Sequence, residues 1–128
     1  MKSNISIPEI SAPLSDTMQA IAPAARVAIL IAIGSGESCV CHLEAVLGWR
    51  QAYISQHLMS LRQAGLLKVR KEGRFAYYSL VNEALLSLIK AAATLSEISP
   101  QLIDQLANPD PGAGCECPTC VPKVITLG

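Results

Sequence analysis

A helical pattern that runs directly into an alternating strand pair is the feature that most constrains the fold of this chain. From Gln51 to Ala64 apolar residues recur at helical spacing, and Gly65 follows as a helix terminator. Residues 67–80 then alternate at strand period on either side of Lys71–Arg74, a turn with glycine near its tip. We therefore predict a helix followed at once by a β-hairpin.

Basic charge is concentrated on this helix and hairpin. Residues 50–74 hold six Lys or Arg against the single acid Glu72, a net charge of +5, whereas the whole chain is neutral and its remainder must carry −5. A solvated helix face can look similar, but a basic hairpin beside a helix of short polar side chains suits a DNA major groove and its phosphates. We expect DNA contacts from the following residues: Gln51, Tyr53, Ser55, Gln56, His57, Arg62, Arg70, Lys71 and Arg74.

Two cysteines stand at the start of the preceding predicted helix, which we expect from about Ser38 to Gly48. The unpaired N–H groups and the dipole at a helix start favour a thiolate at Cys39 and Cys41. Within a helix, side chains two residues apart diverge, but at its start the first can bend back so that both sulfurs face one ion. Ordinary buried packing is the alternative for an isolated cysteine pair. His42 is a further candidate ligand, although we expect it to be exposed.

Three more cysteines lie within six residues near the end of the chain: Cys115, Cys117 and Cys120. They follow a Pro/Gly-rich linker, 108–114, that is long enough to reach a helix start in the same subunit or in its partner. Thiolates select soft ions, so the two groups of cysteines predict a trigonal or tetrahedral sulfur site. The sequence does not separate this from a redox sensor, in which Cys39 or Cys41 forms a disulfide or persulfide with a tail cysteine.

Three pieces of the sequence carry a family resemblance. They are the box Cys-Val-Cys, the segments Ile-Ser-Gln-His-Leu and Leu-Arg-Gln-Ala-Gly-Leu-Leu, and Arg-Lys-Glu-Gly-Arg with an aromatic strand after it. Together, over roughly residues 14–98, they resemble the ArsR/SmtB family of bacterial winged helix-turn-helix repressors. The resemblance implies a mainly α fold with a small β-hairpin, a dimer through terminal helices, and operator DNA that is released when a metal ion or metalloid binds. One departure is Trp49–Arg50, which leaves the reading helix without an obvious N-cap.

The resemblance also reduces the number of metal ions that could be the inducer. Zinc-sensing relatives place Asp and His pairs on the C-terminal helix, but residues 82–100 contain neither. Glu44 stands where arsenic-sensing relatives often have a third cysteine, so the tail must complete the site. Relatives that sense cadmium or lead usually bring cysteines from an N-terminal arm, and residues 1–38 contain none. We therefore predict As(III) or Sb(III) as the favoured inducer, with Cd(II) or Pb(II) as the alternative.

The chain divides into three predicted regions. Residues 1–13, with two prolines, read as an N-terminal arm; residues 14–107 form the winged helix-turn-helix and dimerisation domain; residues 108–128 form a flexible, cysteine-rich tail. Within the domain, a broad apolar face on the helix after Asn82 is the predicted dimer seam, and residues 101–106 can add a short helix.

Other classes of protein fit less well. No apolar run reaches membrane-spanning length and the N-terminus does not resemble a signal peptide, so we expect a cytoplasmic homodimer without membrane contact. An odd count of five cysteines favours thiols or metal ligands over a disulfide framework. A thiol oxidoreductase is the distant alternative, because the C-x-x-C pair of Cys117 and Cys120 follows a linker instead of starting a helix. We expect no enzyme.

Overall fold

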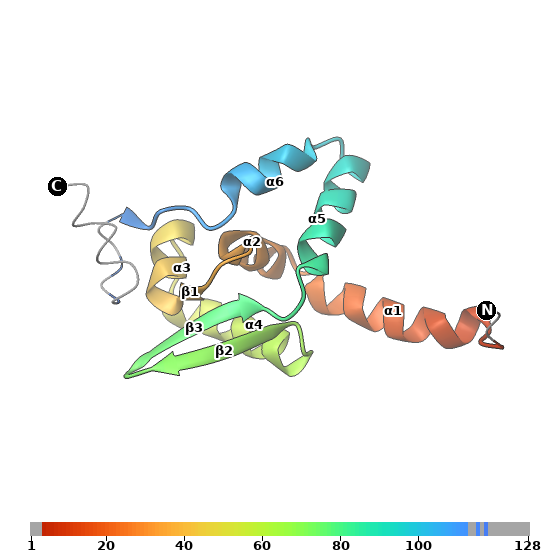
Figure 1. The fold of residues 1–128 in the computed structure, drawn as a ribbon, viewed down its shortest axis with the longest axis horizontal. Coiled ribbons are helices and arrows are strands. Elements are labelled where there is room, and N and C mark those ends of the chain that lie inside the picture. The colour runs from red at the N-terminus through yellow and green to blue at the C-terminus, as the bar shows by residue number, and fades with distance from the viewer. Residues whose placement is uncertain (1–3, 113–114, 116, 118–128) are drawn as a thin grey trace.

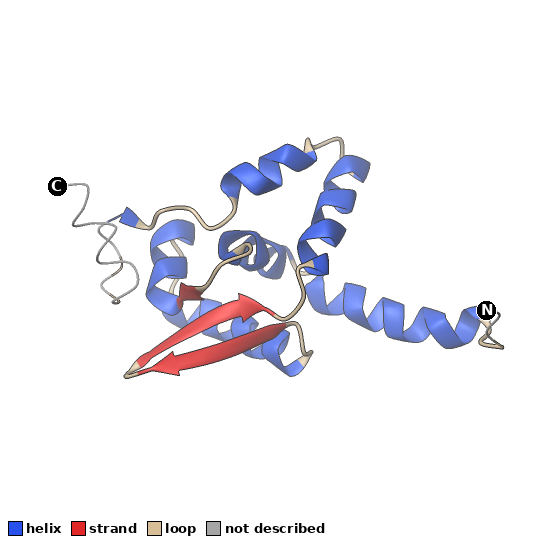
Figure 2. Cartoon of the chain, in the orientation of Figure 1, coloured by secondary structure: helices blue, strands red, loops and turns tan. Residues whose placement is uncertain are grey.

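Six helices and a three-stranded antiparallel sheet make up the described part of the computed structural model, residues 4–112, 115 and 117 (Figure 1; Figure 2). In chain order they are α1 (Ile7–Ile21), α2 (Ala24–Ile33), β1 (Ser38–Cys39), α3 (Val40–Leu47), α4 (Gln51–Gln63), β2 (Leu67–Glu72), β3 (Phe75–Leu80), α5 (Ala84–Leu95) and α6 (Pro100–Leu106). This is the expected mainly α fold, with a hairpin directly after α4.

The apolar stripe of α4 anchors this helix in the core. Ile54, Leu58 and Leu61 are almost fully buried, in one cluster with apolar side chains of α2, α3 and α5. The helix begins at Gln51 as predicted, and no side chain caps its start. Its end is set by Gly65, whose φ of 78° lies in the left-handed region that favours glycine.

The sheet register decides which side chains share a face. In the hairpin, Arg70 pairs with Tyr77, and β1 adds a third strand in which Cys39 pairs with the same Tyr77. Because cross-strand partners point to the same side of a sheet, these three side chains lie on one face. The opposite face carries Leu67 and Leu80, which are buried in the main core.

The N-terminal helix begins earlier than predicted. The expectation of an arm over residues 1–13 is wrong from Ile7 onward, because the Ser6 side chain accepts a backbone N–H of the first turn at 3.3 Å and Pro8 lies in that turn, where a missing N–H costs little. The helix continues through Pro13 and projects away from the other helices (Figure 1). It leaves these apolar side chains exposed: Ile7, Ile10, Leu14 and Met18.

The C-terminal helices follow the sequence prediction. The Asn82 side chain accepts the N–H of Ala84 at 2.8 Å at the start of α5, and Lys90 of α5 forms an ion pair with Asp104 of α6 at 2.7 Å. Leu88 of α5 stays partly exposed. Among the described residues, no single helix is long and apolar enough to cross a membrane, and one pair, α1 with α2, passes that test only together and with a bend of 81°.

The first part of the predicted flexible linker is docked on the domain. Over residues 108–112 the expectation of a free tail is wrong, since the Asn108 N–H donates to the Ile31 carbonyl at 3.4 Å. Two glycines permit this close approach: a Cβ at Gly34 would lie 2.9 Å from the Cβ of the residue before Asn108, and one at Gly36 would collide with the Asn108 amide. This docking directs the chain back towards the start of α3.

Candidate thiol site and DNA-binding surface

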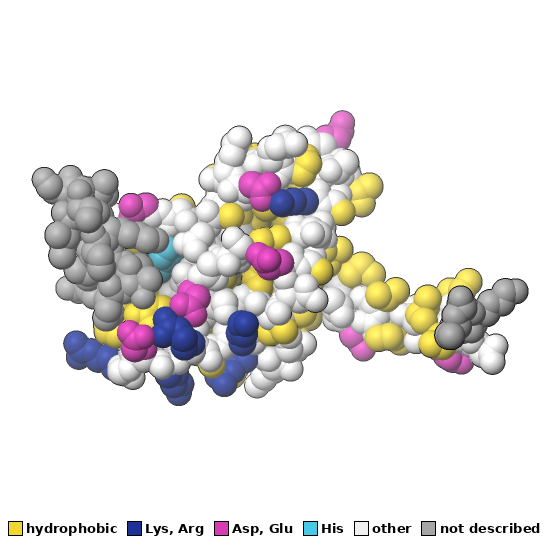
Figure 3. Space-filling view, in the orientation of Figure 1, with side chains coloured by type: hydrophobic (Ala, Val, Ile, Leu, Met, Phe, Trp, Pro, Cys, Tyr) yellow, Lys and Arg dark blue, Asp and Glu magenta, His cyan; other side chains and the backbone are white. Residues whose placement is uncertain are grey.

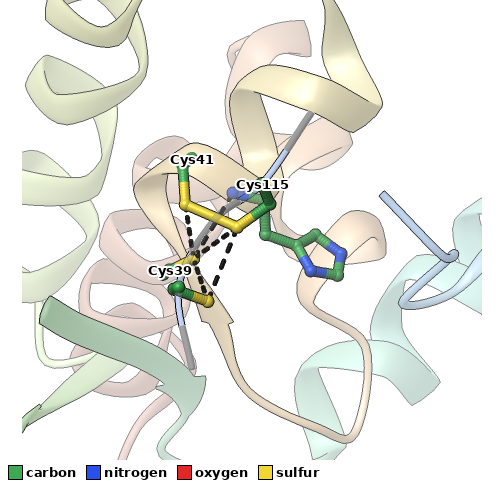
Figure 4. The surroundings of a disulfide bond; sticks show 5 residues. Cys39, Cys41 and Cys115 are labelled. Carbon is green, nitrogen blue, oxygen red and sulfur yellow. Dashed lines mark hydrogen bonds between the residues drawn. A yellow bond between two sulfur atoms is a disulfide. The ribbon is translucent and has the colours of Figure 1, made fainter. Parts of the chain in front are cut away.

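Four cysteine sulfurs from two distant parts of the chain converge beside the first turn of α3. The Sγ atoms of Cys39, Cys41, Cys115 and Cys117 all lie within 4.8 Å of one another. From the Cys39 sulfur the distances are 3.1 Å to Cys41, 3.3 Å to Cys115 and 3.1 Å to Cys117 (Figure 4). The structure thus brings four of the five predicted ligands together within one chain. Cys120 lies outside the described residues.

The start of α3 explains why its two sulfurs face the same point. Cys39 is the N-cap of the helix, with extended backbone, and its sulfur accepts the N–H of His42 at 3.4 Å. This bent-back position brings it towards Cys41 in the first turn, as the sequence analysis expected. The helix dipole favours negative charge at this end, so the site is suited to thiolates.

The thiol cluster is largely sealed from solvent. Cys39, Cys115 and Cys117 are at most 3% exposed. They pack with the buried ring of Tyr77, on the face of the sheet opposite Leu67 and Leu80. Cys41 is only partly buried. A ligand from solvent would therefore meet the Cys41 sulfur first.

Two of the four sulfurs also form a disulfide. Cys41 and Cys115 are joined in this structure, whereas Cys39 and Cys117 are outside that bond (Figure 4). The oxidised pair and a four-sulfur metal site would use the same atoms. The two interpretations of the sequence, metal binding and redox sensing, therefore meet at one place in the fold.

The expected exposure of His42 is wrong, and His57 makes contacts within the chain that were not predicted. His42 was expected to be exposed, but it is only 1% exposed. The short helix α3 packs against α2, α4 and β1, which leaves little of its surface open to solvent. His57, expected to face DNA, turns sideways: its Nδ1 accepts a hydrogen bond from Arg26 Nε at 3.2 Å, and its ring meets that of Tyr53 edge to face. Arg26 also donates to the Ala20 carbonyl at 3.0 Å.

Arg70, predicted to contact a phosphate, is held on the sheet. Its guanidinium forms two hydrogen bonds with Glu37, at 3.1 and 3.0 Å, and one with Glu72 at 2.7 Å, and it lies 4.6 Å from the centre of the Tyr77 ring. The hydrogen bonds from Arg70 lower the pKa of the Glu37 carboxyl below its ordinary value. Glu37 precedes Cys39 by two residues, and we call residues 37–41 the thiol segment. Arg70 therefore connects the thiol segment with the hairpin.

The remaining predicted DNA contacts lie at the surface. On α4, Gln51, Tyr53, Gln56 and Arg62 are exposed and Ser55 is half-buried. On the hairpin, Lys71 and Arg74 are exposed, and no ion pair found in the described part of the chain includes them. Figure 3 shows Lys and Arg side chains gathered along the edge of the molecule that the hairpin occupies.

The outward face of α4 also holds residues that the sequence analysis missed. A shallow hollow is lined by these side chains: Arg50, Ala52, Tyr53, Ser55, Gln56 and Met59. Ala52 and Met59 were overlooked because only polar side chains were considered as base readers. Their spacing of three and four residues from Ser55 and Gln56 is a sequence signal that would have found them.

Known proteins are similar to this chain in sequence and in fold. The model for "Bacterial regulatory protein, arsR family" matches residues 24–69, from α2 into β2. Among solved structures, the transcriptional regulator HlyU from Vibrio vulnificus is 35% identical, with 70% of this chain covering 93% of that one at a TM-score of 0.63. The chain belongs to the ArsR family. For this family member, the prediction of a winged helix-turn-helix is confirmed, with α3 and α4 as the helix pair and β2–β3 as the wing.

Curated relatives of this ArsR-family chain include regulators of metal resistance. The arsenic resistance transcriptional regulator ArsR1 of Pseudomonas putida is 48% identical over 56 residues, which are 44% of this chain and 43% of that protein. ArsR2 of the same organism is 41% identical over 76 residues, 59% and 61% of the two chains. A cadmium resistance regulatory protein, the CadC homolog of Staphylococcus aureus, is 40% identical over 57 residues, 44% and 47%. The chain therefore spans about half the length of these relatives. They are regulators, which agrees with the prediction that this protein is not an enzyme.

Proposed function

We propose that this ArsR-family protein is a repressor that binds operator DNA and releases it when a thiophilic metal(loid) binds Cys39, Cys41, Cys115 and Cys117. The observation that carries the proposal is the convergence of these four sulfurs, all within 4.8 Å of one another, beside the helix pair that would read DNA. The arsenic and cadmium resistance regulators among the relatives support it. A repressor of a bacterial operator acts in the cytoplasm.

Arsenite or antimonite is the proposed inducer. A trivalent metalloid takes three thiolates in a pyramid, and the Cys39 sulfur has three others within 3.3 Å from which such a set can be chosen. The two arsenic resistance regulators of Pseudomonas putida support this choice. The alternative is cadmium or lead, since four sulfurs also suit the tetrahedral geometry of a soft divalent ion. Cys120 remains a proposed fifth ligand.

The repressor is proposed to act as a homodimer. Exposed apolar side chains on α1 and α5 border a hollow of about 380 Å³ whose walls include Met18, Ile21, Leu88 and Ile98. A second copy of the chain would cover this surface, and two α4 helices could then enter successive major grooves of a two-fold operator. Sedimentation of reduced protein at micromolar concentration should give the mass of two chains; the mass of one would contradict the dimer.

The proposed coupling runs through the sheet. Cys39 pairs with Tyr77 between β1 and β3, and Arg70 joins Glu37 of the thiol segment to the wing. An ion bound by the four sulfurs would change the spacing between them, and this would shift β1 and thereby the wing. A coupling of about 3 kcal/mol, roughly a hundredfold in operator affinity, lies at the upper end of the range typical of allosteric proteins.

The direct test is an anaerobic titration. Reduced protein bound to a labelled fragment of its own upstream DNA is titrated with arsenite and, separately, with cadmium chloride, and anisotropy reports release. We expect release at about one equivalent per chain, with arsenite effective at the lower concentration. Cadmium as the stronger inducer would reverse the choice of ion. Tight DNA binding that neither ligand disturbs would contradict metal sensing.

Replacing Glu37 tests the coupling route. Glu37→Gln removes the ion pair between the thiol segment and Arg70, so the ratio of operator affinities without and with arsenite should fall about threefold, as expected for an exposed pair. Since Arg70 lowers the pKa of Glu37, the wild-type carboxylate keeps this pair at neutral pH, and the contribution is lost only as pH falls through that lowered pKa.

The matched control for this substitution is Glu72→Gln. It removes the other ion pair of Arg70, which lies within the hairpin and does not involve the thiol segment. The affinity ratio should then stay at the wild-type value. Equal losses in the two variants would show that Arg70 does not connect the thiol site with the wing.

A redox-sensing repressor is the second candidate, favoured by the Cys41–Cys115 disulfide. Here a peroxide would oxidise the two thiols to the disulfide. The two protons and two electrons released would convert hydrogen peroxide to two water molecules, or an alkyl hydroperoxide to an alcohol and one water molecule. Operator release by hydrogen peroxide in metal-free protein, reversed by dithiothreitol, would support it. Release that requires arsenite or cadmium and does not respond to peroxide would contradict it.

A further inference from the structure

We infer that α4 reads A·T base pairs, with Met59 and Ala52 as the apolar contacts to thymine methyl groups. This inference rests on the operator binding proposed above and adds the class of base that the helix recognises. It concerns two side chains for which neither the metal site nor the wing provides a role.

The orientation of α4 is fixed by its buried side. Ile54, Leu58 and Leu61 are at most 1% exposed, so the helix can present only the opposite face to a groove. That face carries the following residues at helical spacing: Ala52, Ser55, Gln56 and Met59. Met59 is 61% exposed, and all four line the same shallow hollow. A major groove is wide enough to receive this face of a helix.

The chemistry of this face favours one base pair. Guanine is read by Arg or Lys and cytosine by Asp or Glu, but residues 51–61 contain none of these, and Arg50, which also lines the hollow, is the N-cap before the first turn of the helix. Adenine is read by Asn or Gln through two hydrogen bonds, and thymine by apolar contact with its methyl group. Gln56 can supply the two hydrogen bonds to adenine. Ala52 and Met59, on the same face of the helix, can supply the apolar contact with thymine. Arg50 and Arg62 flank the face at the two ends of α4, where phosphates pass.

The position of Met59 separates it from the other exposed apolar side chains. Most of these lie on α1, α5 and the segment through α6, among them Ile7, Leu14, Met18, Leu95, Ile98 and Leu106. A dimer through α1 and α5 would cover that group and leave α4 free. An apolar side chain on the reading face therefore calls for an apolar group of the DNA, and the thymine methyl is the one that a major groove offers.

The test removes the methyl group from the DNA. Reduced full-length protein is used to select duplexes from a pool of random sequence, and thymines in a selected duplex are then replaced one by one by deoxyuridine. We expect A·T pairs at the centre of each half-site, and binding about fourfold weaker for each contacted methyl that is lost. Because wild-type protein is used, this step does not depend on the folding of a variant.

Substitution of Met59 then assigns the contact. In Met59→Ala, binding to the thymine duplex should weaken about fifteenfold, because the proposed dimer loses the contact in both half-sites. One uracil exchange that weakened the wild type should now change the affinity less than about 1.5-fold. Met59→Leu, which keeps an apolar side chain of similar size, should retain most of the penalty. An unchanged penalty in Met59→Ala would assign that methyl to another side chain and overturn the role of Met59.

The outcomes also separate this inference from the proposed function. Selected duplexes with G·C pairs at the centre of each half-site, or no uracil penalty for the wild type, would overturn the inference while operator binding stands. Failure of the wild type to enrich any duplex would overturn operator binding itself, and the inference with it.

Discussion

Release of operator DNA by arsenite should be abolished in Cys39→Ser/Cys41→Ser, while operator affinity in the absence of arsenite should stay within about twofold of the wild type. Serine is a good N-cap, so its hydroxyl at position 39 can accept the His42 N–H that the Cys39 sulfur accepts in the wild type, and α3 keeps its start. Two of four converging sulfurs are lost, and hydroxyls do not replace thiolates for a soft ion. Anisotropy titrations measure both quantities.

The loss of response should be about a hundredfold in the ratio of operator affinities without and with arsenite. Two other results would contradict the proposal. Weak DNA binding by the reduced double variant, with an unfolding transition below that of the wild type, would mean that the two thiols have a structural role. Release by arsenite at the wild-type concentration would place the inducer elsewhere in the protein.

A single substitution in the tail distinguishes the two candidate functions. Cys117→Ser leaves the Cys41–Cys115 pair able to form its disulfide but takes one sulfur from the metal site. A metal sensor should lose affinity for its ion in this variant. A redox sensor should respond to peroxide as the wild type does.

The sequence predicted local geometry well and long-range packing poorly. The α4 helix begins where expected and ends within one residue of its predicted end, because three apolar positions at helical spacing and Gly65 are local signals. The approach of Cys39 to Cys41 was likewise expected from the geometry of a helix start. The burial of His42 was missed because it depends on helices that are distant in sequence. No local pattern shows that His57 faces Arg26.

The source of the tail cysteines was open in the sequence for a similar reason. A linker of this length reaches either subunit, and what determines its course here is docking at Asn108, where Gly34 and Gly36 leave room. The restraint on Arg70 was missed because the strand register was not predicted, and the register is what places Arg70 beside Tyr77 and near Glu37. A list of basic residues therefore does not show which of them already have acidic partners.

The wing variant Lys71→Ala/Arg74→Ala should bind every DNA sequence more weakly and with a flatter dependence on salt. Both side chains are exposed on the hairpin, and neither belongs to an ion pair found within the described residues, so their charges can meet phosphates. The proposed dimer would lose four phosphate contacts, so the slope of log affinity against log salt should fall by roughly 3.6, and affinity near physiological salt by on the order of a hundredfold.

Lys90→Ala is the control for loss of charge as such. Lys90 lies on α5, paired with Asp104 of α6 and outside the wing, so its removal should change the slope by less than about 0.5. Arg70→Ala should change the slope less than Arg74→Ala, since Arg70 is already engaged by Glu37 and Glu72. An unchanged slope in the wing variant would remove the hairpin from the DNA-binding surface. Arg50 and Arg62 at the ends of α4 would then be left as the basic contacts to phosphate.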